Sequence, residues 1–209
     1  MAVSPGIFRQ YDIRGIVGKD LTAEAATAVG RGFAALMRER GVKGKIVVSR
    51  DNRPSGEMLR NSLVAGLTGF GVDVVDIGVV PTPLNYWAIH HLGVAGGIQI
   101  TGSHNPPEYN GFKLTLGGSV HGEEIQKLYG LINAAPGKVS QGNVSTAEVI
   151  DQYVDDMVKR TGPLPKSMKV VYDCGNGAAS LVAPQLFKKL GIDAHGLFCE
   201  SDEIGRAHV

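Results

Sequence analysis

The chain has 209 residues, of which 43% are hydrophobic and 20% charged, a composition that is typical of a globular protein and excludes a disordered tail, a fibre or a low-complexity chain. Its 21 Lys and Arg residues nearly balance its 20 Asp and Glu residues, so the net charge of +1 provides no global field that would recruit nucleic acid or an anionic membrane. The 29 glycines are about twice the usual share of ~7%, which indicates many tight turns and close backbone approaches.

Helical and strand patterns alternate along the first part of the chain. Apolar residues at helical spacing predict helices over 22–40, 55–70, 82–91 and 123–133, with Thr22, Ser55 and Thr82 as N-caps. Short β-branched or apolar runs predict strands over 45–49, 72–78, 96–101 and 111–116. This alternation favours a three-layer α/β/α domain with a mixed, mostly parallel sheet, in which the last two strands, flanking a polar loop, form the antiparallel pair.

A change in composition divides the chain. Residues 134–147 are mostly small and polar and predict a linker, so we assign 1–147 to one domain and 148–209 to a second. The second part predicts a helix over 148–160 and then a single βαβ unit, which cannot cover both faces of its own sheet. We therefore expect an incomplete α/β domain whose uncovered strands favour self-association.

The N-terminal segment has no apolar core typical of a signal peptide, and no stretch approaches about 18 uninterrupted apolar residues, so the sequence favours a cytoplasmic location. The two cysteines, Cys174 and Cys199, lack CxxC spacing and a complement of histidines. Two reduced, partly buried thiols are favoured over a disulfide or a metal pair.

The segment TGSHNPPEYNGFK (101–113) is the most informative part of the sequence. Gly102 leaves room beside Ser103, and Asn105 and the two prolines that follow stiffen the loop, so the hydroxyl of Ser103 is expected on a rigid, open loop. Spacing alone leaves a nucleophile and an ordinary turn serine both open. A hydrolase triad is disfavoured because GxSxG is absent and His104 would point away from Ser103 in an extended chain.

Together with YDIRG (11–15), RDNRPSG (50–56), PTP (81–83) and DCGNGA (173–178), in that order, this loop resembles the α-D-phosphohexomutase superfamily, in particular its bacterial phosphomannomutase/phosphoglucomutase branch. The resemblance extends from Phe8 to Glu200 and implies a mutase that interconverts hexose 1-phosphate and 6-phosphate through a phosphoserine and a bisphosphate intermediate. Its partner would be a phosphosugar, with hexose 1,6-bisphosphate as activator.

The resemblance also assigns roles to residues. Ser103 would carry the phosphoryl group, Arg14 would hold its oxygens with a forked guanidinium, and Lys113 would exchange protons near the reacting oxygens. His104 is assigned to catalysis beside the serine. Tyr11 is assigned to substrate binding. Structural roles in the turn remain open for both.

Asn105 is likewise assigned to substrate binding, and Arg50 and Arg53 to bracing the loop. Mg²⁺ would bind the phosphate on Ser103 together with the aspartates of a DGDGDR loop, which this sequence lacks. Matches to the sugar-reading and distal-phosphate motifs of the family are also lacking, and the final SDEIGRAHV departs from the family pattern as a truncation or frameshift would. We therefore expect the chain to be inactive by itself.

Two other interpretations remain. The GxG spacing of Gly175 and Gly177 between a strand and a helix, with Glu200 at the end of the next strand, resembles half of a dinucleotide-binding fold, although Ser180 replaces the third glycine. The chain could also be a non-catalytic interaction or structural module.

Overall fold

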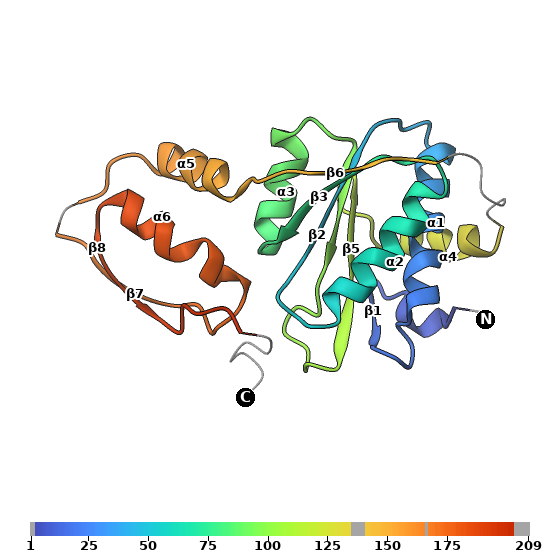
Figure 1. The fold of residues 1–209 in the computed structure, drawn as a ribbon, viewed down its shortest axis with the longest axis horizontal. Coiled ribbons are helices and arrows are strands. Elements are labelled where there is room, and N and C mark those ends of the chain that lie inside the picture. The colour runs from blue at the N-terminus through green and yellow to red at the C-terminus, as the bar shows by residue number, and fades with distance from the viewer. Residues whose placement is uncertain (1–2, 135–140, 166, 203–209) are drawn as a thin grey trace.

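The computed structural model describes residues 3–134, 141–165 and 167–202, which form a larger and a smaller lobe (Figure 1). The larger lobe is built on a six-stranded sheet with the strand order β1-β5-β4-β2-β3-β6. The strands are β1 (Ile13–Ile16), β2 (Ile46–Arg50), β3 (Val74–Val79), β4 (Gly96–Ile100), β5 (Tyr109–Leu116) and β6 (Val144–Thr146).

Four of the six strands, β4, β2, β3 and β6, run parallel to one another, while β5 is antiparallel to both β4 and β1. The mixed, mostly parallel sheet and its antiparallel β4–β5 pair are confirmed. Strands β1 and β6 are not anticipated by the sequence patterns. β6 lies inside the predicted linker, 134–147, where residues 135–140 are outside the described part of the chain.

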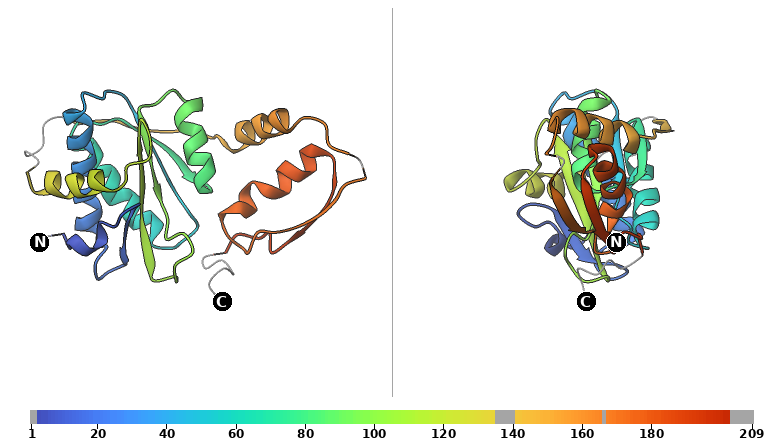
Figure 2. Two further views of the ribbon diagram at one scale, coloured as in Figure 1. Left: turned by 180° about the vertical axis from the view of Figure 1, so that it is seen from behind. Right: turned by 90° about the vertical axis from the view of Figure 1, so that its left-hand side faces the viewer.

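Helices cover both faces of this sheet (Figures 1 and 2). Helices α1 (Ala23–Glu39), α2 (Gly56–Thr68) and α4 (Glu123–Ala134) pack on one face, and α3 (Thr82–His91) packs on the other. Side chains of a strand alternate between the two faces of a sheet, so strand β2 contributes residues to the cores on both faces. Ile46 and Val48 join one hydrophobic core, and Val47 joins the other.

The helix starts agree only partly with the expected caps. The hydroxyl of Thr22 accepts a hydrogen bond from the backbone N–H of Ala25 at 3.2 Å, as an N-cap does. Ser55 occupies the cap position of α2 without capping it, and its hydroxyl accepts instead from Nδ2 of Asn110 at 2.9 Å. Thr82 is the first residue of α3 and Pro81 is its cap residue, so the expected start is wrong by one residue. A 3-10 turn (η1, Pro5–Ile7) precedes the first strand.

The smaller lobe contains the predicted βαβ unit. Strand β7 (Lys169–Asp173) pairs in parallel with β8 (Asp193–Leu197), and between them lie a 3-10 turn, η2 (Ala178–Leu181), and helix α6 (Ala183–Leu190). Helix α5 (Ile150–Thr161) packs against both α6 and α3, so the core beneath α3 continues into this lobe.

The two-stranded ladder of the smaller lobe leaves apolar side chains in solvent. Val171 on β7 is 69% exposed and Leu197 on β8 is 38% exposed. These exposed side chains are consistent with an incomplete layer, and self-association through them stays a prediction. No helix in the described ranges is both long and apolar enough to cross a bilayer.

Candidate functional site

Residues 101–108, here called the serine loop, connect β4 to β5. The backbone of this loop holds Ser103 in an uncommon conformation. Ser103 is exposed and has a φ of 54°, the left-handed region that non-glycine residues rarely adopt. Its N–H donates to Oγ1 of Thr101 at 2.9 Å, and the N–H of Asn105 donates to the carbonyl of Gly102 at 3.1 Å. Such backbone strain persists only where surrounding contacts enforce it and is often found at functional sites.

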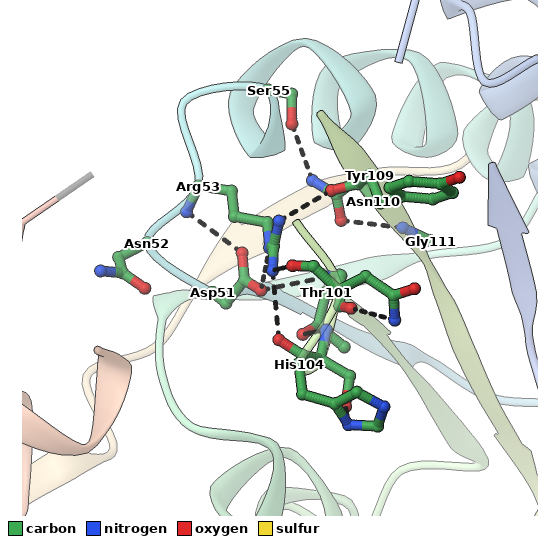
Figure 3. A network of polar contacts seen from close by, with 12 residues as sticks. Asp51, Asn52, Arg53, Ser55, Thr101, His104, Tyr109, Asn110 and Gly111 are labelled. Atoms are coloured by element: carbon green, nitrogen blue, oxygen red, sulfur yellow. Dashed lines mark hydrogen bonds and ion pairs between the residues drawn. The ribbon is translucent and has the colours of Figure 1, made fainter. Parts of the chain in front are cut away.

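Arg53, which follows β2, supplies those contacts (Figure 3). Its side chain is buried and its guanidinium donates to four backbone carbonyls of one loop. The acceptors are Ser103 at 3.1 Å, Asn105 at 2.6 Å, Pro106 at 2.8 Å and Tyr109 at 2.9 Å. A planar group with five donors in a fixed geometry can satisfy such a set of carbonyls, whereas an ammonium has only three donors.

Gly102 and Asp51 complete this bracing. A Cβ at position 102 would overlap the guanidinium of Arg53 and lie 2.5 Å from its Nε, so only glycine lets the arginine pass. The carboxylate of Asp51 accepts from the N–H of Gly102 at 3.3 Å and forms an ion pair with Nε of Arg53 at 3.4 Å. These contacts support the expected role of Arg53 in bracing the loop. Asp51 takes part in the same bracing, although the sequence patterns do not indicate it.

Arg14 and Lys113 are brought together by a second carboxylate. Asp12 is buried, forms an ion pair with the buried side chain of Arg14, and lies 3.6 Å from Nζ of Lys113 through the same oxygen, Oδ2. No sequence motif singles out Asp12, although its position two residues before Arg14 places both side chains on one face of an extended segment. Two cations and one carboxylate leave one net positive charge at this point.

The sheet places these cations close to the serine loop. Arg14 on β1 is opposite Gly111 on β5, and Gly111 accepts a hydrogen bond from the N–H of Thr101 at 3.0 Å. Arg14 and Thr101 are therefore about 10 Å apart across two strand spacings. The Nε of Arg14 is buried and has no hydrogen-bond partner among the described residues. A buried, unsatisfied guanidinium N–H is a donor suited to an anion.

The remaining predicted residues are less closely tied together. Nδ1 of His104 lies 3.4 Å from Oγ of Ser103, so the expectation that His104 points away is wrong, because the left-handed turn at Ser103 interrupts the extended chain on which it rested. The amide of Asn105 donates to the carbonyl of Gly102 at 3.1 Å, which is a contact within the loop. Tyr11 is 68% exposed, and its ring centroid lies 6.5 Å from that of His121.

A pocket of about 250 Å³ opens beside the serine loop. Ser103 lines it from one side, and residues of the turn after β7, including Cys174, Gly175 and Gly177, line it from the other. Asn52 joins the two sides because its Nδ2 donates to the carbonyl of Asn176 at 3.1 Å. A ligand in this pocket would therefore touch both lobes.

The described residues contain no group of three or more His, Cys, Asp or Glu side chains that could hold a metal ion. Asp51 is the only carboxylate among the residues that line the pocket with Ser103. One carboxylate and a serine oxygen are too few ligands for Mg²⁺, so the residues described here do not form a magnesium site by themselves.

Comparison with known proteins identifies the family of this fold. Residues 5–137 match the family model described as phosphoglucomutase/phosphomannomutase, alpha/beta/alpha domain I. The chain belongs to the phosphoglucomutase/phosphomannomutase family, of which it contains an N-terminal portion.

Individual relatives agree with this assignment. A phosphomannomutase/phosphoglucomutase of Pseudomonas putida is 45% identical over 202 residues, which cover 96% of this chain and 43% of the relative. A phosphoglucomutase of Neisseria gonorrhoeae is 41% identical, with 96% of this chain and 44% of the relative covered. A solved family structure from Burkholderia thailandensis superposes with a TM-score of 0.86 at 43% identity and covers 96% of this chain and 45% of its own. The chain thus spans less than half the length of the relatives it matches.

The dinucleotide interpretation requires an α-helix that starts directly at the glycine turn, so that its N-terminus meets the pyrophosphate. The structure instead places the 3-10 turn η2 after Gly177 and starts α6 only at Ala183. This geometry gives the dinucleotide alternative no support.

Proposed function

We propose that this chain supplies the phosphoserine-bearing part of a phosphomannomutase/phosphoglucomutase. Ser103 carries the phosphoryl group and passes it to the free hydroxyl of a hexose 1-phosphate or 6-phosphate. The resulting bisphosphate turns around, and its other phosphoryl group returns to Ser103. Each transfer breaks one phosphorus–oxygen bond and forms another, so the serine is regenerated in its phosphorylated form.

The observation that carries this proposal is the exposed hydroxyl of Ser103 on a loop held in a left-handed turn by the buried Arg53. Phosphoryl transfer needs positioning and charge neutralisation more than covalent help from the protein. A rigid loop supplies the positioning. A phosphoserine adds nearly two negative charges, which the cations on the adjoining strands can offset.

The residues take separate roles in this scheme. Arg14 offers its unsatisfied Nε to a phosphoryl oxygen, while Asp12 orients the guanidinium. Lys113 faces the same carboxylate and exchanges the proton of the sugar hydroxyl. Nδ1 of His104 lies within reach of Oγ of Ser103, and His104 assists the transfer of the phosphoryl group at that oxygen. Tyr11 and Asn105 are assigned to sugar contacts.

Magnesium, which family resemblance implies, would bind the phosphoryl oxygens on Ser103 together with the aspartates of a DGDGDR segment, which this sequence lacks. Residues 3–134, 141–165 and 167–202 offer no cluster of carboxylates in its place. Sugar recognition and the distal phosphate site likewise have no matching motif in this sequence.

A chimera tests the proposal. Residues 1–200 of this chain would be joined to the C-terminal part of the Pseudomonas putida relative, whose N-terminal portion is 45% identical to it. We expect mutase activity with a phosphate on Ser103, detected by mass spectrometry as a gain of about 80 Da. Ser103→Ala should reduce turnover to background, and Lys113→Ala should reduce it by about 10²–10⁴-fold. The matched control is Ser119→Ala, at an exposed serine outside the loop. A folded chimera that is active without Ser103, or inactive with it, would refute the assignment.

The isolated chain is expected to show no more than trace turnover. The reason is that the sequence has no DGDGDR segment and the part of the chain that the structure describes holds no cluster of metal ligands, so Arg14 and Lys113 would offset only part of the charge on the transferred group. A coupled assay with mannose 1-phosphate, glucose 1,6-bisphosphate and Mg²⁺ measures this directly. Sustained product formation would show that 209 residues suffice.

A further inference from the structure

The two cysteines lie together at the ends of adjacent strands in the smaller lobe. Cys174 follows β7 directly, and Cys199 comes two residues after β8. Their sulfur atoms are 3.6 Å apart, and both residues are free and half-buried. The expectation of reduced, partly buried thiols agrees with this, but the sequence gives no sign that the two would be in contact.

The backbone holds both cysteines in place. In the parallel β7–β8 ladder Asp173 is opposite Leu197, and the N–H of Cys174 donates to the carbonyl of Leu197 at 3.0 Å. The next turn is tied in the same way, because the N–H of Asn176 donates to the carbonyl of Phe198 at 2.8 Å. Continued by one residue, this register puts Cys174 opposite Phe198 and leaves Cys199 one residue farther along. With strands about 4.8 Å apart and a rise of about 3.3 Å per residue, the two Cα atoms would lie about 6 Å apart, which is within the separation that a disulfide spans.

Gly196 keeps the Cys199 thiol close to its partner. A Cβ at position 196 would lie 2.7 Å from Sγ of Cys199 and 2.7 Å from the hydroxyl of Tyr172, so only glycine leaves this space for the sulfur. The sulfurs need to approach by about 1.5 Å to reach the bond length of about 2.05 Å, a shift that side-chain rotation can provide.

We propose that Cys174 and Cys199 are a redox-active pair that forms a reversible intramolecular disulfide with small disulfides such as glutathione disulfide. The thiolate of Cys199 attacks one sulfur of the small disulfide, which forms a mixed disulfide and releases one small thiol. The thiolate of Cys174 then attacks Sγ of Cys199 and releases the second small thiol. Two protein thiols are oxidised to one disulfide, and one small disulfide is reduced to two thiols, so atoms and electrons balance.

Burial, and next the adjoining thiol of Cys199, raise the pKa of Cys174 to about 11, with Asp173 adding to the rise and the nearby hydroxyl of Ser180 opposing it. The Cys174 thiol is therefore mostly protonated at neutral pH, and we assign the first attack to Cys199. Burial, the largest cause, persists in the mixed disulfide, so ring closure is expected to become faster as the pH rises from 7 to 9 and the thiolate fraction of Cys174 increases.

The bond would act on the pocket beside Ser103, because Cys174 forms part of its wall and Asn52 is hydrogen-bonded to Asn176 of the same turn. A disulfide would link Cys174, in the wall of the pocket, to Cys199 after β8, and so restrict the motion of the turn that follows β7. The thiol chemistry itself requires no mutase activity.

The test treats the reduced 209-residue chain with glutathione disulfide and follows free thiols, intact mass and migration on non-reducing gels. We expect both thiols to disappear from a monomer whose mass falls by about 2 Da, reversal by dithiothreitol, and a melting temperature higher by several degrees. Cys174→Ser and Cys199→Ser are the matched controls. Cys199→Ser should be slow to react, and Cys174→Ser should retain one glutathione on Cys199.

A second arm repeats the oxidation in urea. Each closure rate is divided by the thiolate fraction of Cys174 measured in the same solvent, because unfolding removes the burial that raises the pKa of this thiol. At equal thiolate fraction closure should be at least about tenfold slower in urea, because the unfolded chain no longer holds the sulfurs together. The proposal is overturned if both thiols survive equilibration with the oxidant, if the native chain stops at glutathione adducts, if disulfides form only between chains, or if closure at equal thiolate fraction is as fast in urea as in the native state.

Discussion

Replacing Arg53 with alanine is expected to lower the free energy of unfolding by about 3–5 kcal/mol. The substitution leaves four loop carbonyls without their donor and removes the partner of the Asp51 carboxylate. Hydrogen bonds to a charged group contribute more than the modest net gain of an ordinary hydrogen bond, and the largely buried Asp51 carboxylate loses its ion-pair partner as well. Urea unfolding followed by circular dichroism measures the change.

The conservative variant separates charge from geometry. Arg53→Lys keeps the charge but replaces a planar group of five donors with an ammonium of three, so it should recover only part of the loss. Hydrogen exchange at the amides of Asn105 and Tyr109, which close turns within the loop, should become faster in both variants. Arg31→Ala, at an exposed position on α1, is the control and should change stability by less than about 0.5 kcal/mol. A loop that stays protected in Arg53→Ala would mean that the guanidinium does not organise it.

Replacing Gly66 with alanine is expected to destabilise the chain by about 3 kcal/mol, opposite in sign to the usual effect of this change within a helix. Helices α1 and α2 touch through their backbones at Gly30 and Gly66. A Cβ at position 66 would overlap the carbonyl oxygen of Thr27 and lie 3.0 Å from its carbonyl carbon. Backbone cannot rotate away as a flexible side chain can, so the two helices must separate.

Gly130→Ala is the matched control for this prediction, since Gly130 lies within α4 and a Cβ there would meet no atom within 4 Å. It should stabilise the chain by about 0.5–1 kcal/mol, because alanine restricts the unfolded chain without straining the folded one. Thermal or urea unfolding of both variants should therefore shift in opposite directions. Equal shifts would contradict the close helix contact.

The fold was largely predictable because its periodic patterns are local. The helix over 22–40 and the strand over 45–49 carry their spacing, caps and stops in adjacent residues, and the structure confirms them as α1 and β2. Strands β1 and β6 were missed because they are short and their strand character comes from pairing. β1 forms against β5, and β6 adds to the edge at β3, although the exposed residues of β6 show no strand alternation.

The candidate site also has features that neighbouring residues predict and features that depend on the pairing of distant strands. The loop around Ser103 could be singled out from its glycine, serine and prolines, because those residues limit the backbone directly. The contact of Asp12 with both Arg14 and Lys113 could not be, since Lys113 is far along the chain and reaches that carboxylate only after β1 and β5 have paired. His104 was misjudged because the left-handed φ of Ser103 is imposed from outside the loop, by Arg53.

The amino-acid sequence by itself determined the order of the helices and of strands β2 to β5 in the larger lobe, the alternation that covers both faces of the sheet, and the open loop that presents Ser103. Those features depend on residues that are neighbours along the chain, where backbone preference and hydrophobic period act directly. Only the tertiary structure decided which distant groups meet: the guanidinium of Arg53 with the loop carbonyls, Asp12 with its two cations, and the thiols of Cys174 and Cys199. Such contacts arise from strand register and packing, which bring together residues that local preference leaves independent.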